Sequence, residues 1–226
     1  MNKATYLMLE NFMLECMADS AHDKEHVYRV LNHALVIAED EKDVDLDVLI
    51  AACLLHDIAR PEQIRDPSLC HAEVGSLKAF GFLRENGFSE TFCEHVRDCI
   101  RTHRFRKNDP PKTLEGKILF DADKLDVVGA IGVARTLVYK GTVSDPLYTR
   151  REDGTISNGT NDTESSFFRE YKFKLEKLYD RFYTKKGAIL AEGRKEAAKN
   201  FYNNLFCEVN LFDVAGKNLL DAYISE

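Results

Sequence analysis

Features that mark membrane and secreted proteins are missing from this sequence of 226 residues. No stretch approaches the roughly 18 uncharged apolar residues that a membrane-spanning helix needs. The apolar run near the N-terminus is broken by Glu10 and Glu15, and it has neither a basic flank nor a small-residue cleavage site, so it does not resemble a signal peptide. The sequence therefore predicts a cytoplasmic protein.

Paired cysteines and an excess of positive charge are also absent. The six cysteines form no CxxC pair, and several lie within apolar helical patterns, which indicates reduced core residues. The formal net charge is -7, which argues against a general nucleic-acid binder. We expect no nucleic-acid polymer and no membrane among the partners, whereas a small anionic ligand is compatible if a cation or a local basic cluster offsets the acidic field.

What the sequence does contain is enough apolar material for one substantial core. Hydrophobic residues make up 44% and charged residues 31% of the chain, as in an ordinary globular protein. No composition shift or internal repeat divides the sequence, and the alternating pattern of strands is absent. These observations predict an all-α fold and a single domain over residues 1–226.

Apolar residues at helical spacing predict a series of helices. They cover residues 3–17, 23–38, about 48–57, 71–85, 90–103 and 116–140, with two more helices between 167 and 208 and a short one in the tail up to 226. Residues 60–69 contain two prolines and are expected to form a loop. Residues 141–166 are rich in small polar residues and form a long connection, which predicts either a lid over a site or a surface excursion.

The adjacent residues His56 and Asp57 follow an apolar run and are the first candidates for chemistry. An imidazole and a carboxylate are costly to bury alone, so a buried pair is usually matched by a metal ion or a hydrogen-bond network. Two neighbouring side chains on one helix cannot close a coordination sphere. Further ligands must therefore come from distant parts of the chain.

Candidates for those further ligands lie at or near the ends of other predicted helices, which is the arrangement of a metal site in a helical bundle. They are His26, His71, His103 and an aspartate of the sequence Asp121-Ala122-Asp123. Periodicity does not decide between the two aspartates. Mixed imidazole and carboxylate ligands suit Mn, Fe, Co, Ni or Zn better than Ca.

The phrases EHVYRVLNHA, LLHDIAR and ILFDADKLDVVGAIGVAR together resemble the HD-domain superfamily of metal-dependent phosphohydrolases. The similarity is greatest to small bacterial HD hydrolases of the nucleotide pyrophosphohydrolase type, and it covers about residues 20–140. It implies an HD-type helical bundle with a divalent metal ion (Mn, Fe, Co, Ni, Zn or Mg) in its core. The implied metal ligands are His26, His56, Asp57 and Asp123.

The resemblance leaves two readings for His71 and His103. Some members of the superfamily bind a second metal through two histidines between the HD pair and the final aspartate, and these residues occur in that order. Alternatively, both histidines orient water or contact phosphate in a site with one metal.

By the same resemblance, we expect cleavage of a phosphate ester or anhydride of a nucleotide. Asp57 or a nearby acid is a candidate proton acceptor. Arg60 stands where many HD nucleotidases carry a glutamate, which puts a glutamate general acid in doubt and fits a phosphate clamp instead. Lys124 and Arg104 are expected to add positive charge, although the run 104–107 also fits a solvated basic turn.

Several other functions are compatible with these residues. Within the superfamily they are a 5'-nucleotidase, a (p)ppGpp hydrolase, a phosphodiesterase and a di-iron oxygenase. An alternative that is not an enzyme is a non-catalytic regulator that binds metal.

Overall fold

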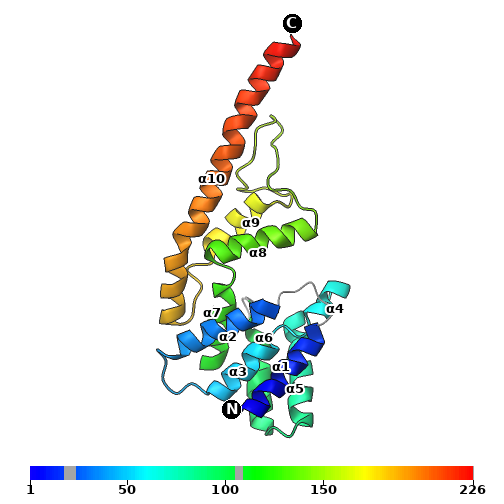
Figure 1. Cartoon of the computed structure of the whole chain (residues 1–226), viewed down its shortest axis with the longest axis vertical. Coiled ribbons are helices and arrows are strands. Elements are labelled where there is room, and N and C mark those ends of the chain that lie inside the picture. The colour runs from blue at the N-terminus through cyan, green and yellow to red at the C-terminus, as the bar shows by residue number, and fades with distance from the viewer. Residues whose placement is uncertain (18–23, 105–108, 226) are drawn as a thin grey trace. The chain divides into compact units, whose positions relative to one another are not determined.

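The computed structural model describes residues 1–17, 24–104 and 109–225, and these ranges are helical without any strand (Figure 1). An isolated bridge pairs Arg150 with Ile156. The prediction of an all-α fold is confirmed. None of the helices within these ranges is long and apolar enough to cross a membrane.

Contacts divide the chain into two compact units. The first comprises Met1–Asp126 and Phe182–Ala188, and the second comprises Val127–Arg181 and Ile189–Glu226. The assignment of the whole chain to one domain stays a prediction. Each unit is described by itself below.

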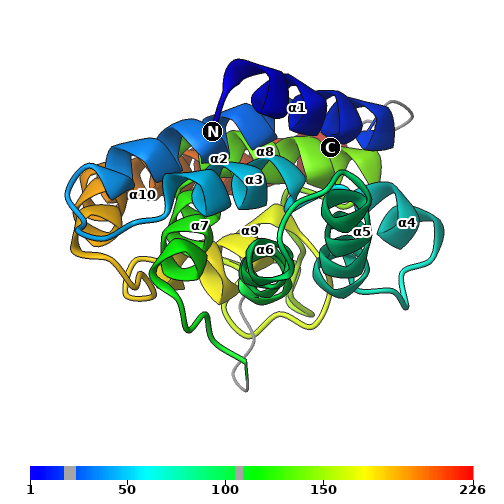
Figure 2. The same cartoon turned by 90° about the horizontal axis from the view of Figure 1, so that it is seen from below.

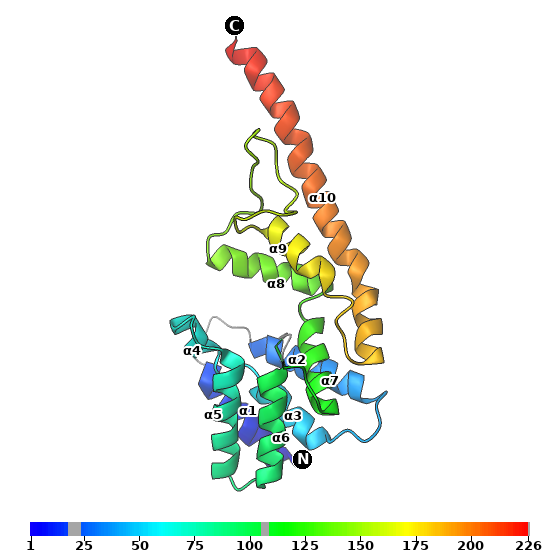
Figure 3. The same ribbon diagram turned by 180° about the vertical axis from the view of Figure 1, so that it is seen from behind.

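The first unit packs its helices around α3. They are α1 (Lys3–Met17), α2 (Lys24–Ala38), α3 (Leu46–Leu55), α4 (Arg60–Arg65), α5 (His71–Glu85), α6 (Glu90–Thr102) and α7 (Leu114–Leu125). Helix α3 is apolar around nearly its whole circumference, and it contacts α1, α2, α5, α6 and α7. Figures 2 and 3 show α5 and α6 side by side in this unit, which agrees with their extensive contact.

Side chains cap the N-termini of three of these helices. The Asp45 side chain accepts hydrogen bonds from the backbone N–H of Asp47 and Val48 at the start of α3. Ser89 and Thr113 cap α6 and α7 in the same way. Such caps satisfy backbone donors that a helix leaves unpaired at its N-terminus.

The segment after α3 differs from the expected loop. Helix α3 ends at Leu55, and a turn containing His56 and Asp57 leads directly into the short helix α4. Pro61 lies in the first turn of α4, where its missing N–H costs no intrahelical hydrogen bond. The prediction that residues 60–69 form only a loop was therefore wrong for 60–65.

The predicted helix over 116–140 is two helices. Helix α7 ends at Leu125, and α8 (Gly129–Thr142) begins after a break at residues 126–128. Gly129 has a φ of +69°, in the left-handed region that favours glycine, and a Cβ there would lie 2.7 Å from the Arg194 Cβ. The break thus depends on a glycine that has no room for a side chain.

The second unit contains α8, α9 (Phe167–Phe173), the 3-10 turn Leu175–Lys177 and all but the first residues of α10 (Lys185–Ile224). Aromatic rings form its core, with the rings of Tyr171 and Tyr202 stacked at 4.2 Å and Phe168 packed against Phe206. Helix α10 is continuous over 40 residues. The sequence predicted this helix to end near 208 and a short separate helix to follow.

The connection between α8 and α9 is held by internal hydrogen bonds. Asp162 accepts from the hydroxyls of Thr149 and Ser157, and Arg150 forms an ion pair with Asp213 of α10. All these residues belong to the second unit. A role of residues 141–166 as a lid stays a prediction.

Candidate metal centre

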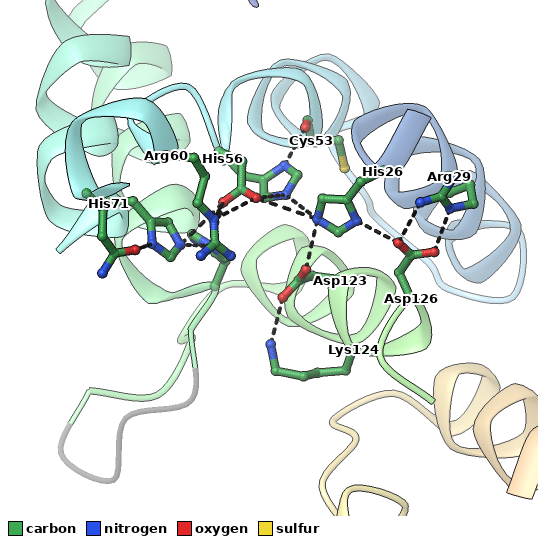
Figure 4. A network of polar contacts seen from close by, with 12 residues as sticks. His26, Arg29, Cys53, His56, Arg60, His71, Asp123, Lys124 and Asp126 are labelled. Carbon is green, nitrogen blue, oxygen red and sulfur yellow. Dashed lines mark hydrogen bonds and ion pairs between the residues drawn. The ribbon is translucent and has the colours of Figure 1, made fainter. Parts of the chain in front are cut away.

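The first unit gathers four histidines and two aspartates from five separate parts of the chain (Figure 4). All six side chains belong to residues that are at most 7% exposed. They are His26 in α2, His56 and Asp57 in the turn after α3, His71 at the start of α5, His103 at the end of α6 and Asp123 in α7. A buried set of this kind requires compensation by hydrogen bonds or a cation.

Three of these residues form the first ligand set. The candidate ligand atoms of His26, His56 and Asp123 lie within 4.8 Å of one another. The Nε2 atom of His26 is 3.4 Å from the Asp123 Oδ1 atom and 3.4 Å from the His56 Nε2 atom. These three side chains can therefore face one ion.

The remaining three residues form the second ligand set. The candidate ligand atoms of Asp57, His71 and His103 also lie within 4.8 Å of one another. The Asp57 Oδ1 atom is 3.3 Å from the His71 Nε2 atom and 3.7 Å from the His103 Nε2 atom. The structure thus brings together the two histidines whose role the sequence left open.

Asp57 faces both ligand sets. While its Oδ1 atom points to His71 and His103, its Oδ2 atom lies 3.6 Å from the His26 Nε2 atom and 3.7 Å from the His56 Nε2 atom. A carboxylate offers separate oxygens to two cations. The arrangement accommodates one ion on either side of Asp57.

Each of the four imidazoles is oriented through its Nδ1 atom, which lies beside an oxygen acceptor. The pairs are His26 with Asp126 Oδ2 at 2.7 Å, His56 with the Cys53 carbonyl at 2.7 Å, His71 with Gln63 Oε1 at 2.5 Å, and His103 with the Ile100 carbonyl at 2.5 Å. Because these oxygens accept, the Nδ1 atoms carry the protons and the Nε2 lone pairs are directed at the cluster. Metal-binding histidines are held in this manner, so the donor set fits a divalent metal ion.

Burial sets the protonation of two of the histidines. Burial lowers the pKa of His56 to about 4 and that of His71 to about 2, although Asp57 opposes both shifts. For His26, burial also disfavours the charged form, but hydrogen bonds to Asp123 and Asp126 outweigh it and raise the pKa. Neutral imidazole is the form that binds a metal ion, and His56 and His71 have this form near neutral pH.

The two aspartates remain ionised despite their burial. Burial alone would raise the pKa of Asp57, but Arg60 and His56 hold it well below its usual range. Lys124 has the corresponding effect on the pKa of Asp123. Both carboxylates therefore carry the negative charge that a cation requires.

Two cations that the sequence singled out lie beside these carboxylates. The Arg60 Nε atom donates to both oxygens of Asp57 at 3.0 Å, and the Lys124 Nζ atom is 2.7 Å from the Asp123 Oδ2 atom. The Arg60 side chain is 30% exposed and that of Lys124 is 12% exposed. Arg104 donates to the Cys70 thiol at 3.7 Å, whereas residues 105–107 of the basic run lie outside the described residues.

Asp126 and Asp121 have different roles in the structure. Asp126 accepts from His26, as expected for a carboxylate behind a ligand. Asp121, the other aspartate that the sequence offered as a ligand, lies away from the two ligand sets, and its carboxylate accepts from the backbone N–H groups of Tyr183 and Thr184. It therefore anchors the segment 182–188 within the first unit.

Sequence reasoning missed Arg29 and Gln63. Arg29 donates to Asp126 from its Nε and Nη2 atoms, at 2.8 and 3.1 Å. Its position three residues after His26, on the same helical face, was the available signal. The contact of Gln63 with His71 was not predicted, because the segment that contains Gln63 was expected to be a loop.

Comparison with known proteins gives consistent matches. The family model of the HD domain matches residues 24–128. The protein YpgQ of Bacillus subtilis is 32% identical over 194 residues, which cover 82% of this chain and 83% of YpgQ.

Solved structures are similar along nearly the whole chain. A predicted HD-superfamily hydrolase from an uncultured Thermotogales bacterium is 32% identical, with 92% of this chain and 99% of that chain covered and a TM-score of 0.60. An HD-superfamily hydrolase from Bacillus thuringiensis is 27% identical, with 92% and 98% covered and a TM-score of 0.69. The structure of Bacillus subtilis YpgQ in complex with ADP is 26% identical, with 89% and 97% covered and a TM-score of 0.66.

Proposed function

This chain belongs to the HD-domain family of metal-dependent phosphohydrolases, and we propose that it is a nucleotide pyrophosphohydrolase. The observation that carries the proposal is the position of Asp57 between two buried ligand sets, each closed by histidines with directed Nε2 atoms. The ADP bound in the structure of YpgQ supports a nucleotide as the ligand class.

We assign the six buried residues to metal binding. His26, His56, Asp57 and Asp123 would hold one divalent ion, and Asp57, His71 and His103 would hold a second. Divalent ions in such a site supply Lewis-acid chemistry, because they make water more acidic and offset negative charge on phosphoryl oxygens.

The charge on Asp57 favours ligation over proton transfer. Since Arg60 and His56 hold its pKa well below the usual range, Asp57 is a weak proton acceptor at neutral pH. We therefore place Asp57 in the role of a shared ligand. The low pKa of Asp57 disfavours the role of proton acceptor that the sequence suggested for it.

Arg60 and Lys124 are placed to contact phosphate. Each is partly exposed and lies directly beside a ligand carboxylate. A guanidinium binds phosphate oxygens through paired N–H groups, and an ammonium acts as a compact charge. Both residues would draw an anionic nucleotide to the metal centre against the net charge of -7.

The direct experiment is a product analysis of the full chain, stripped of metal and then loaded with Mn²⁺. Nucleoside triphosphates, diphosphates and monophosphates are incubated separately, and products are identified by phosphorus NMR. The proposal predicts pyrophosphate and monophosphate from a triphosphate. Release of orthophosphate from monophosphates would instead identify a 5'-nucleotidase, and absence of any turnover would reject the proposal.

Two variants control this experiment. Asp57→Asn should abolish turnover while the helical circular dichroism is retained. Asp66→Asn is the matched control, because Asp66 is exposed and its side chain accepts hydrogen bonds from the nearby Ser68, outside both ligand sets. Equal activity in both variants would contradict the assignment of Asp57.

A further inference from the structure

Gln63 is the only glutamine of the chain, and its side-chain amide contacts a candidate metal ligand. The Gln63 Oε1 atom lies 2.5 Å from the Nδ1 atom of His71, and the Gln63 Nε2 atom donates to the carbonyl oxygen of Leu69 at 3.0 Å. Gln63 belongs to α4, Leu69 lies in the connection that leads to α5, and His71 is the first residue of α5. The amide therefore links α4 to the second ligand set.

The contact with Leu69 fixes which end of the amide faces His71. A carbonyl oxygen only accepts hydrogen bonds, so the NH2 group of Gln63 points to Leu69 and its oxygen points to the imidazole. That oxygen accepts only from a protonated Nδ1 atom, and the neutral ring then carries its lone pair on Nε2. The Nε2 atom of His71 lies 3.3 Å from the Asp57 Oδ1 atom. Gln63 thus selects the tautomer of His71 that can bind an ion in the second ligand set.

The two ligand sets differ in the negative charge that they offer to a cation. The first set has a carboxylate of its own, that of Asp123, whose Oδ1 atom faces His26 while Lys124 binds the Oδ2 atom. Within residues 1–17, 24–104 and 109–225, the second set has only the shared carboxylate of Asp57. Because the charge of the ligands tunes metal affinity, the second set should hold a divalent ion less tightly.

The acceptors behind the imidazoles differ in the same direction. One histidine of each set faces a backbone carbonyl through its Nδ1 atom. These two histidines are His56 and His103. The other histidine of the first set, His26, faces the carboxylate of Asp126, whereas His71 faces the neutral amide of Gln63. Figure 4 shows His71 and Asp126 at opposite ends of the cluster. A carboxylate behind an imidazole makes it a stronger ligand than a neutral acceptor does.

We propose that Gln63 is a positioning residue for the second ion. Its amide orients His71 for metal binding, and because the amide is neutral, it keeps the affinity of the second ligand set below that of the first. This role rests on the proposed function, in which each ligand set holds one divalent ion. As the metal concentration rises, the first ligand set fills before the second. Gln63 acts through His71 and does not contact the ion.

The test is a titration of the full chain, stripped of metal, with Mn²⁺ against a fluorescent chelator and without nucleotide. The wild type should bind two ions, the second with a dissociation constant roughly 10-fold or more above the first. Two variants of Gln63 form a matched pair. Gln63→Leu removes the acceptor for His71 and the donor to Leu69, whereas Gln63→Glu removes the same donor and supplies a charged acceptor. The difference between the two variants therefore reports on the acceptor alone.

The two variants should change the second dissociation constant in opposite directions. Gln63→Leu should raise it by roughly 10- to 100-fold and leave the first constant unchanged. Gln63→Glu should lower it by on the order of 10-fold, because a carboxylate strengthens the imidazole as a ligand. Leu77→Glu controls for the added negative charge, since Leu77 is 61% exposed on α5, and it should change neither constant.

Nitrogen NMR of the imidazoles gives a second readout on the metal-free chain. His71, assigned by comparison with His71→Ala, should be the Nδ1–H tautomer in the wild type. In Gln63→Leu, its signals should shift towards a mixture of both tautomers, because no acceptor selects one of them. Circular dichroism shows whether the variants keep the helical fold. If Gln63→Leu does not fold, the tighter binding expected of Gln63→Glu decides the proposal.

Three results would overturn the role of Gln63. The first is a wild type that binds only one ion, and the second is a second dissociation constant that is the same in the wild type and in both Gln63 variants. The third is equal weakening in Gln63→Leu and Gln63→Glu, which would assign the effect to the lost contact with Leu69. Because the titration contains no nucleotide, absence of turnover on every nucleotide would reject the enzymatic proposal alone.

Discussion

The Nδ1 atom of His26 lies 2.7 Å from the Oδ2 atom of Asp126, a residue 100 positions later in the chain. Arg29 holds the same carboxylate through two nitrogens. Asp126 therefore fixes the orientation of an imidazole whose Nε2 atom faces Asp57 and Asp123. The metal affinity of the first ligand set should depend on a residue that does not bind the metal.

Replacement of Asp126 tests this dependence. Asp126→Asn should weaken binding of Mn²⁺ by roughly 10- to 100-fold, because the imidazole loses its charged acceptor. Titration against a fluorescent chelator measures the dissociation constant. Asp98→Asn, at an exposed position on α6, is the control. Unchanged affinity in Asp126→Asn would show that the His26 ring is held by other contacts.

Loss of His71 should affect only one ligand set. His71→Ala removes a ligand of the second set and leaves His26, His56 and Asp123 in place. Metal analysis after gel filtration should show about one equivalent fewer than in the wild type. If the metal content stays the same, His71 does not bind metal, and its alternative role beside water or phosphate gains support.

Replacement of Arg60 by lysine should lower the activity even though the positive charge is kept. Its Nε atom donates to both oxygens of Asp57, a geometry that a lysine ammonium does not reproduce. Arg60→Gln should lower kcat/KM by on the order of 100-fold, and Arg60→Lys should recover only part of this loss. Steady-state kinetics on the full nucleotide panel measure both values. Full activity in Arg60→Gln would show that Arg60 does not contribute to catalysis or phosphate binding.

Asp121 is expected to matter for stability. Its fully buried carboxylate accepts from two backbone N–H groups and from the Thr184 hydroxyl, so Asp121→Ala leaves several buried donors without a partner. The free energy of unfolding should fall by about 2 to 4 kcal/mol, measured by urea denaturation. Asp121→Asn keeps one acceptor and should lose less. Equal stability of wild type and Asp121→Ala would contradict this role.

The ion pair between Arg150 and Asp213 should respond to acid. The hydrogen bond from Arg150 lowers the pKa of Asp213 from 3.8 to about 2. A depressed folded-state pKa stabilises the contact above pH 3.8, and the contribution is lost as the pH falls from 3.8 towards 2. Hydrogen exchange at residues 150–156 should therefore increase in this window in the wild type.

The variant Asp213→Asn provides the comparison for this pH effect. The variant should already show the faster hydrogen exchange at neutral pH. In acid, the exchange rates of the variant and the wild type should become equal. Because the pair is exposed, the difference should be small and should shrink further in high salt. A difference that is independent of pH would show that Asp213 acts through packing.

Local signals in the sequence predicted much of the first unit. The caps Asp45, Ser89 and Thr113 act on neighbouring residues, so their roles follow from the chain itself. The order of the histidines and aspartates also indicated a converging set. The features that the sequence did not predict depend on contacts between residues that are distant in the chain. The break before Gly129 reflects its approach to Arg194, and the role of Asp121 reflects residues 183 and 184.

The C-terminal helix shows a different limit of sequence reasoning. The sequence predicted a helix end near residue 208 and a short separate helix after it, but α10 continues without a break to Ile224. Helix propensity is a weak guide where the stabilising contacts lie outside the local sequence. Large apolar residues along these turns, among them Phe212 and Leu219, are exposed.

Anomalous diffraction from crystals grown with Mn²⁺ tests most directly whether Asp57 is shared by two ions. Two anomalous peaks per chain are expected, one beside His26, His56 and Asp123 and the other beside His71 and His103, with Asp57 contacting both ions. A single peak away from Asp57, or no peak within these buried residues, would contradict this arrangement.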